Sequence, residues 1–245
     1  LGPTLRKLVT AARFNPRLPY LSFLCINFDA PVVKEAASWF LDGVFLNYNS
    51  SYLEQMLEQL LDEDDSPDVT RFLRAVDVRI DGFRVERAPE WRGQRVFVRH
   101  EVGGKAYELR LSEESAGTQK LMGLAAYLMT ALERGGTVVV DELDAKLHPK
   151  LLRYVILLFK DPGVNKSGAQ LIFSSQDVST MRNDVFRRDE IWFAARGEGE
   201  ASQLWSLADI HEANGNLVSK NAAFDKQYLS GRYGADPYLT RIEEW

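Results

Sequence analysis

The spacing of hydrophobic positions changes along this chain of 245 residues, and each spacing predicts a different kind of element. Up to residue 76, apolar residues recur mainly every three to four positions, as in amphipathic helices, over 31–46, 52–61 and 69–76. A short apolar segment at 20–27 precedes these helices. The acidic run 62–68 interrupts them. We interpret it as a solvated loop, because a flexible run offers no fixed cage for a metal ion.

From residue 78 the apolar positions alternate with polar ones, which predicts β-strands. Residues 78–85 are expected to form a strand or a bulged pair of strands. Residues 94–102 and 106–111 alternate on either side of Gly103-Gly104. A glycine-rich turn between two alternating runs is typical of a β-hairpin.

Beyond residue 113 helical and strand patterns follow one another, which predicts an α/β fold with parallel strands. The expected elements are a helix over 115–133, a buried strand over 137–141, a helix that starts at Pro149 and ends near Asp161, a buried strand over 170–175, and a hairpin formed by 190–195 and 202–206. Trp39, Trp192 and Trp205 are interpreted as core residues of their helix and strands. The aromatic and charged segment from Ala222 onward is expected to pack on the rest of the chain.

Composition narrows the class of protein without identifying it. A net charge of −5 provides no general attraction to nucleic acid or anionic lipid. The single cysteine, Cys25, excludes an internal disulfide and is typical of a reducing compartment. The sequence has no apolar run of the roughly 18 residues that a membrane-spanning helix requires. We therefore expect a cytoplasmic protein that does not enter the membrane.

Two adjacent carboxylates close the apolar run that ends at residue 140. Asp141 and Glu142 would be costly at the end of a buried strand unless a cation or solvent meets them. In a nucleotide site, Asp141 would hold Mg²⁺ and Glu142 would polarise the attacking water as a general base. The alternative is a strand end with two solvated acids.

A second motif, Ser-x-Gly-x-Gln at 115–119, stands at the expected start of a long helix. Ser115 is well placed as the N-cap, and Gly117 lets the backbone approach a ligand closely. Free N–H groups and the positive end of the helix dipole would together form a phosphate site. The alternative is a capped helix without a ligand.

A third motif is the strand over 170–175, which runs into Gln176 and Asp177. A polar side chain at such a strand end could sense the terminal phosphate of a nucleotide. Alternatively, Ser175 or Asp177 caps the segment that follows.

The order and spacing of these motifs resemble the carboxy-terminal half of an ABC-type ATPase head. Residues 115–119 resemble the ABC signature, 138–142 the Walker B strand and 144–148 the D-loop, while Gln176 occupies the position of the switch histidine. The resemblance implies that Ser115, Gly117, Thr118, Gln119, Asp144 and His148 contact the nucleotide, that Asp141 is the metal ligand, and that Glu142 and Gln176 are catalytic.

The chain is more similar still to bacterial AAA-type, SMC/RecF-like ATP-binding proteins of abortive-infection and anti-phage operons. The resemblance is carried by the motifs at 113–121, 141–149, 169–177, 187–193 and 228–234. It implies an α/β ABC-type ATPase head with a P-loop NTPase-like sheet and a peripheral β-hairpin. Residues 1–76 would form an inserted helical lobe, and residues 77–245 the carboxy-terminal half of the head.

The same resemblance implies ATP and Mg²⁺ as cofactors and a homodimer or higher oligomer with composite ATP sites. Ser115 and Gly117 of one subunit would then contact the γ-phosphate that the other subunit holds. The resemblance also suggests that the protein gates a protein effector, a nuclease or a toxin, in antiviral defence.

The chain departs from the family pattern at three points. Lys146 stands where many relatives have serine in the D-loop. Gln176 replaces the usual histidine, and glutamine cannot take a charged, proton-shuttling form, so slow hydrolysis is expected. The sequence has no Gly-x-x-x-x-Gly-Lys-Ser/Thr phosphate loop, which we expect upstream of Leu1. Two alternatives stay open: a non-hydrolysing ATP-dependent scaffold, and a RecF/SMC-like DNA-repair ATPase that binds nucleic acid.

Overall fold

The structure is a computed structural model that describes residues 17, 19–47, 67–76, 80–87, 94–196, 201–212 and 214–235. Its contacts divide the chain into two units. The first comprises Leu1–Asp141 and Leu158–Phe173, and the second Glu142–Leu157 and Ser174–Trp245. The helix expected over 52–61 lies outside the described residues. The division at residue 76 into a lobe and a head stays a prediction.

The first unit contains a parallel sheet of three strands, β1 (Val44–Asn47), β5 (Thr137–Val140) and β6 (Gln170–Phe173), in the order β1-β5-β6. The middle strand β5 is buried, with Val138 and Val140 at most 1% exposed. A run of β-branched residues suits this position because both faces and both edges of a central parallel strand are covered. The predicted α/β class is confirmed.

Helix α6 (Ala116–Arg134) packs against β1 and β5, and its start and end agree with the sequence signals. Ser115 caps its first turn, and Gly135 ends it in the left-handed conformation at φ 84°. One side of the helix supplies much of the core of this unit. Its fully buried side chains are Leu121, Met122, Leu124, Ala125, Leu128 and Ala131.

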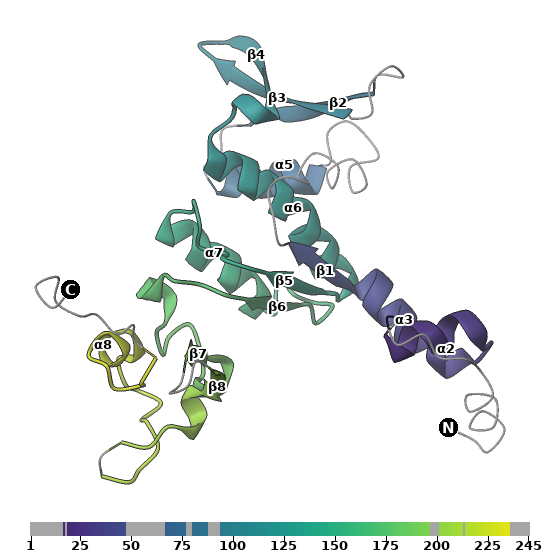
Figure 1. Cartoon of the computed structure of the whole chain (residues 1–245). Helices are drawn as coiled ribbons and strands as arrows, with labels where there is room; N and C mark the ends of the chain where they lie inside the picture. The colour runs from purple at the N-terminus through teal and green to yellow at the C-terminus, as the bar shows by residue number, and fades with distance from the viewer. Residues whose placement is uncertain are drawn as a thin grey trace, which may run out of the picture. The chain divides into compact units, whose positions relative to one another are not determined.

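A separate antiparallel sheet in the same unit has the order β2-β3-β4, with β2 (Gly82–Arg87), β3 (Gln94–Val102) and β4 (Lys105–Arg110). The predicted hairpin around Gly103-Gly104 is confirmed, and both glycines have positive φ. Helix α5 (Pro67–Ala75) lies beside α6 (Figure 1). Arg74 of α5 donates to the carbonyls of Ile80 and Asp81 at 3.3 and 3.1 Å, which ties the helix to the start of β2.

Two helices, α2 (Tyr20–Asn27) and α3 (Pro31–Gly43), contact each other around Phe23, Leu24 and Val33. The helix expected over 31–46 was predicted too long, because it ends at Gly43 and the chain continues as β1. Backbone pairing of β1 with β5 supplies hydrogen bonds that the local pattern of apolar residues does not reveal.

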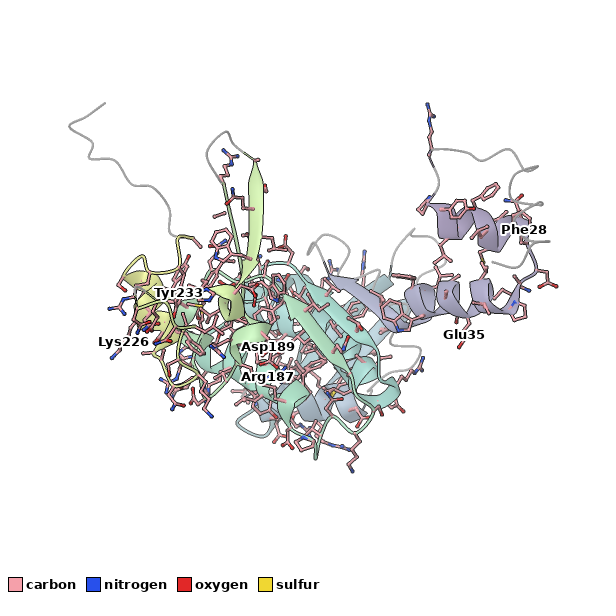
Figure 2. The ribbon with its side chains drawn as sticks, turned by 90° about the horizontal axis from the view of Figure 1, so that it is seen from below. Phe28, Glu35, Arg187, Asp189, Lys226 and Tyr233 are labelled. Carbon is pink, nitrogen blue, oxygen red and sulfur yellow. The ribbon has the colours of Figure 1, made fainter. Side chains whose placement is uncertain are left out.

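The second unit contains most of α7 (Pro149–Lys160), together with the hairpin of β7 (Trp192–Arg196) and β8 (Ser202–Ser206) and the short helix α8 (Phe224–Leu229). Phe193 stacks on Tyr228, with ring centroids 5.7 Å apart. Tyr233, which Figure 2 labels, belongs to the same cluster. Burial raises the pKa of Tyr233 to about 12. The segment from Ala222 onward is therefore packed as far as residue 235, as expected.

Burial corrects three of the sequence interpretations. Strand β6 is not fully buried: it is the last strand of its sheet among the described residues, and its Ile172 is 56% exposed. Trp39 and Trp192 are 54% and 58% exposed, so neither is a core residue.

None of the helices in the described part of the chain combines the length and the apolar character that a membrane-spanning helix needs.

Gly135 and Gly168 offer a matched test of backbone strain in the first unit. Both have positive φ, but a Cβ at Gly135 would lie 2.4 Å from the carbonyl oxygen of Ser167, whereas nothing lies within 4 Å of a Cβ at Gly168. We expect Gly168→Ala to lower the free energy of unfolding by about 1 kcal/mol and Gly135→Ala by roughly 2–4 kcal/mol. Urea denaturation of both variants measures the difference, and equal costs would contradict the proposed backbone clash.

Candidate nucleotide site

Each unit holds part of the predicted site. In the first unit, Asp141 directly follows β5 and is exposed, while the preceding Val140 is buried. The strand therefore delivers a carboxylate to solvent at its carboxyl end, which is where ligands bind in open α/β sheets.

The predicted phosphate-binding segment of the first unit is an ordered helix start. The Ser115 Oγ accepts a hydrogen bond from the Thr118 N–H at 3.1 Å, and the two hydroxyl oxygens lie 2.8 Å apart. Gln119 turns back, and its Nε2 donates to the Glu114 carbonyl at 2.8 Å. Helix geometry leaves the N–H groups of Ala116 and Gly117 without partners within the helix, so they are available to an anion.

In the second unit, Glu142 occupies an uncommon backbone conformation. Its φ is +50°, and outside glycine the left-handed region costs of order 1 kcal/mol. The Glu142 N–H donates to Ser174 Oγ at 2.8 Å, and the Leu143 N–H donates to the Ser174 carbonyl at 3.0 Å. Leu143 is fully buried. These contacts hold a strained turn that presents an exposed carboxylate, and such strain is concentrated at functional sites.

Asp144 connects this turn to the segment that follows β6. One oxygen, Oδ2, accepts hydrogen bonds from the N–H groups of Gln176 and Asp177 at 3.2 and 3.1 Å. The other, Oδ1, is buried and has no hydrogen-bond partner among the described residues. Asp177 in turn accepts from the Ser179 N–H at 2.6 Å, which confirms the alternative that it caps the next segment. Asp144 thus positions the backbone of Gln176.

His148 caps helix α7. Its Nδ1 accepts a hydrogen bond from the Lys150 N–H at 3.2 Å. Its carbonyl accepts from the N–H groups of Leu151 and Leu152. The nucleotide contacts expected for His148 and Asp144 stay predictions, beside these structural roles.

Hydrogen bonds bring Glu142, Asp144 and Gln176 together in the second unit, whereas Asp141 and the helix start at Ser115 belong to the first. The sequence interpretation did not single out Ser174, which fixes the backbone of both Glu142 and Leu143. The available signal was a hydroxyl residue directly after an apolar strand.

The donor set at the end of β5 is compatible with Mg²⁺. Carboxylate oxygens are hard ligands, and Mg²⁺ is usually bound by one or two carboxylates, with phosphate oxygens and waters completing the octahedron. Among the described residues, no group of three or more His, Cys, Asp and Glu could hold a metal ion by itself.

Asp144→Ala tests the link between the turn and the Gln176 segment. The change leaves two backbone N–H groups without their acceptor, which should cost about 1–3 kcal/mol locally. We expect faster hydrogen–deuterium exchange at the amides of Gln176 and Asp177. Asp144→Asn is the matched control, because its side-chain oxygen can still accept. Unchanged exchange in the alanine variant would contradict this role.

The chain matches the model of a known protein family. Residues 16–182, more than half of the chain, match a family model described as "AAA domain, putative AbiEii toxin, Type IV TA system". No curated protein matches the chain.

Solved structures of SMC ATPases show limited similarity. One comes from work on the ATP-driven dimerization and DNA-stimulated activation of SMC ATPases, with a TM-score of 0.42 and 15% identity over 64% of this chain and 89% of that chain. An SMC head with an extended coiled coil, bound to the C-terminal domain of ScpA from Pyrococcus furiosus, has a TM-score of 0.36 and 18% identity over 57% and 34%. An SMC head bound to the C-terminal winged-helix domain of ScpA has a TM-score of 0.36 and 16% identity, and the match covers 57% of this chain and 42% of that chain.

Proposed function

The chain belongs to the AAA-domain family whose model it matches over residues 16–182, and on that premise we propose that it is part of a dimeric ATPase head that binds ATP and hydrolyses it slowly. The observation that carries this proposal is the turn at Glu142. Glu142, the second residue after a buried parallel strand, has an exposed carboxylate and a strained backbone, and Ser174 holds its backbone amide.

Asp141, Glu142 and Gln176 would each have a separate role in the reaction. Asp141 would bind the metal, and Mg²⁺ supplies charge neutralisation at the phosphates when it is bound. Glu142 would accept the proton of the attacking water. Gln176, positioned by Asp144, would donate a hydrogen bond to the terminal phosphate.

The helix start at Ser115 would complete the site of a second copy. The N–H groups of Ala116 and Gly117 and the dipole of α6 favour a γ-phosphate held by the partner subunit. Thr118 would contribute its hydroxyl and Gln119 the shape of the loop. ATP that contacts two subunits stabilises the dimer by linkage, and the closed dimer then changes what an attached effector protein can do. We place this effector, a nuclease or a toxin, in anti-phage defence because of the sequence resemblance.

The test measures the rate of ATP hydrolysis and the oligomeric state of the full-length protein. That protein includes any phosphate loop that the gene encodes outside these residues. We expect hydrolysis above background with Mg²⁺, loss of hydrolysis with a chelator, and dimers with ATP but not with ADP in sedimentation velocity. Failure to bind nucleotide would overturn the proposal.

A non-hydrolysing scaffold is the second candidate, and Gln176 is the feature that favours it. A glutamine can hold a phosphate but cannot shuttle a proton as a histidine does. In this case ATP would still drive dimerisation, while turnover would stay at the background rate with and without Mg²⁺.

A further inference from the structure

A hydrogen-bonded pair of largely buried side chains lies directly before the helix start at Ser115. His100 Nε2 and Glu114 Oε1 are 2.6 Å apart, and the two side chains are only 20% and 9% exposed. His100 lies within β3, where it is paired with Tyr107 of β4. Glu114 is the last residue before the N-cap of α6. The pair therefore joins the antiparallel sheet β2-β3-β4 to the segment that would meet the phosphate.

The backbone of Glu114 is fixed as firmly as its side chain. Its N–H donates to the Leu111 carbonyl at 3.2 Å, and Leu111 is buried. Its carbonyl accepts from Gln119 Nε2 at 2.8 Å, so the first turn of α6 is tied back to the same residue. A continuous set of contacts thus leads from β3 through Glu114 to Ser115 and Gln119.

We propose that His100 and Glu114 are positioning residues that hold Ser115 and the first turn of α6 in the geometry required for a phosphate. The inference rests on the proposed function, since it concerns the same anion site. Neither side chain needs to touch the nucleotide. Their role is to make the position of the helix start depend on the sheet β2-β3-β4.

The His100–Glu114 pair is more buried than an ion pair on the same sheet. Exposed pairs contribute little, and Arg84–Glu108, at 3.0 Å, is 38% and 40% exposed. Removal of His100 would take away the hydrogen-bond partner of the Glu114 carboxylate, so the segment would shift until that carboxylate reaches water. A displacement of about 1 Å at a group that must meet a reacting phosphate can reduce function roughly 100-fold.

The test compares His100→Ala, Glu114→Ala and the double variant in the full-length protein. We expect faster hydrogen–deuterium exchange of amides 115–119 in each, and ATP-dependent dimerisation weakened by roughly 10–100-fold. The double variant should be no worse than either single one, because the pair acts as a unit. Nucleotide affinity of the monomer and the melting temperature should change little.

Two further variants separate positioning from general damage. His100→Gln retains a side-chain N–H donor and should restore most of the dimerisation. Glu108→Gln removes an ion pair from the same sheet without touching the helix start, and should behave as wild type. A purely structural role would instead lower the melting temperature, nucleotide affinity and dimerisation together, with no rescue.

The inference and the proposed function fail in different ways. If the wild-type protein does not dimerise with ATP, the proposed function is lost, while exchange of amides 115–119 still decides the positioning role. If wild type dimerises and His100→Ala matches it in both exchange and dimerisation, the positioning role is overturned.

Discussion

Glu142→Gln is expected to lower kcat for ATP hydrolysis by about 10²–10⁴-fold, while the affinity for ATP stays close to that of wild type. Glutamine has nearly the shape of glutamate but cannot accept the proton of the attacking water. The hydrogen bond from the residue 142 amide to Ser174 and the left-handed backbone are retained, so the loss reports proton transfer rather than a displaced turn. Steady-state phosphate release and equilibrium nucleotide binding measure the two quantities separately.

The control for this substitution is Glu133→Gln, a change of an exposed residue in the last turn of α6. It should leave turnover and binding unchanged. Because the Glu142 variant holds ATP without cleaving it, its ATP-bound dimer should also persist longer than that of wild type. If wild type and Glu142→Gln hydrolyse ATP at the same background rate, the protein is not an ATPase and the non-hydrolysing scaffold is the better hypothesis.

Leu143→Ala is expected to lower the free energy of unfolding by about 2–5 kcal/mol. Leu143 is fully buried, and its N–H donates to the Ser174 carbonyl, so the side chain anchors the turn between Glu142 and Asp144. Truncation leaves a cavity where the turn is held, and the turn relaxes around it. Turnover should therefore fall together with stability, unlike in Glu142→Gln. Chemical denaturation followed by circular dichroism gives the stability change.

Leu229→Ala provides the comparison, because Leu229 belongs to the same unit and is 71% exposed. Its cost should stay within about 0.5 kcal/mol. A cost below about 1 kcal/mol for Leu143→Ala would show that the turn does not depend on this side chain.

Local chemistry in the sequence was enough to predict several elements closely. The hairpin of β3 and β4 follows from alternating residues around Gly103-Gly104. Helix α6 follows from the cap at Ser115 and the stop at Gly135. These signals act within a few residues, so they are readable without the fold.

Contacts between distant segments were not predictable in the same way. The local pattern predicts a helix at residues that form strand β1. The strand forms because it pairs with β5, which is far away in the chain. The exposure of Trp39 and Trp192 depends on which other segments pack against them. The residue type alone does not determine those neighbours.

The candidate site shows the same division. The sequence by itself determined which residue types follow β5 and β6 and precede α6, because buried strands and capped helices leave a clear local pattern. Only the tertiary structure decided that Ser174 fixes the backbone of Glu142, that Asp144 accepts from the amides of Gln176 and Asp177, and that His100 meets Glu114. Each of these hydrogen bonds joins segments separated along the chain, and such a bond forms only when the fold brings its donor and acceptor within about 3 Å.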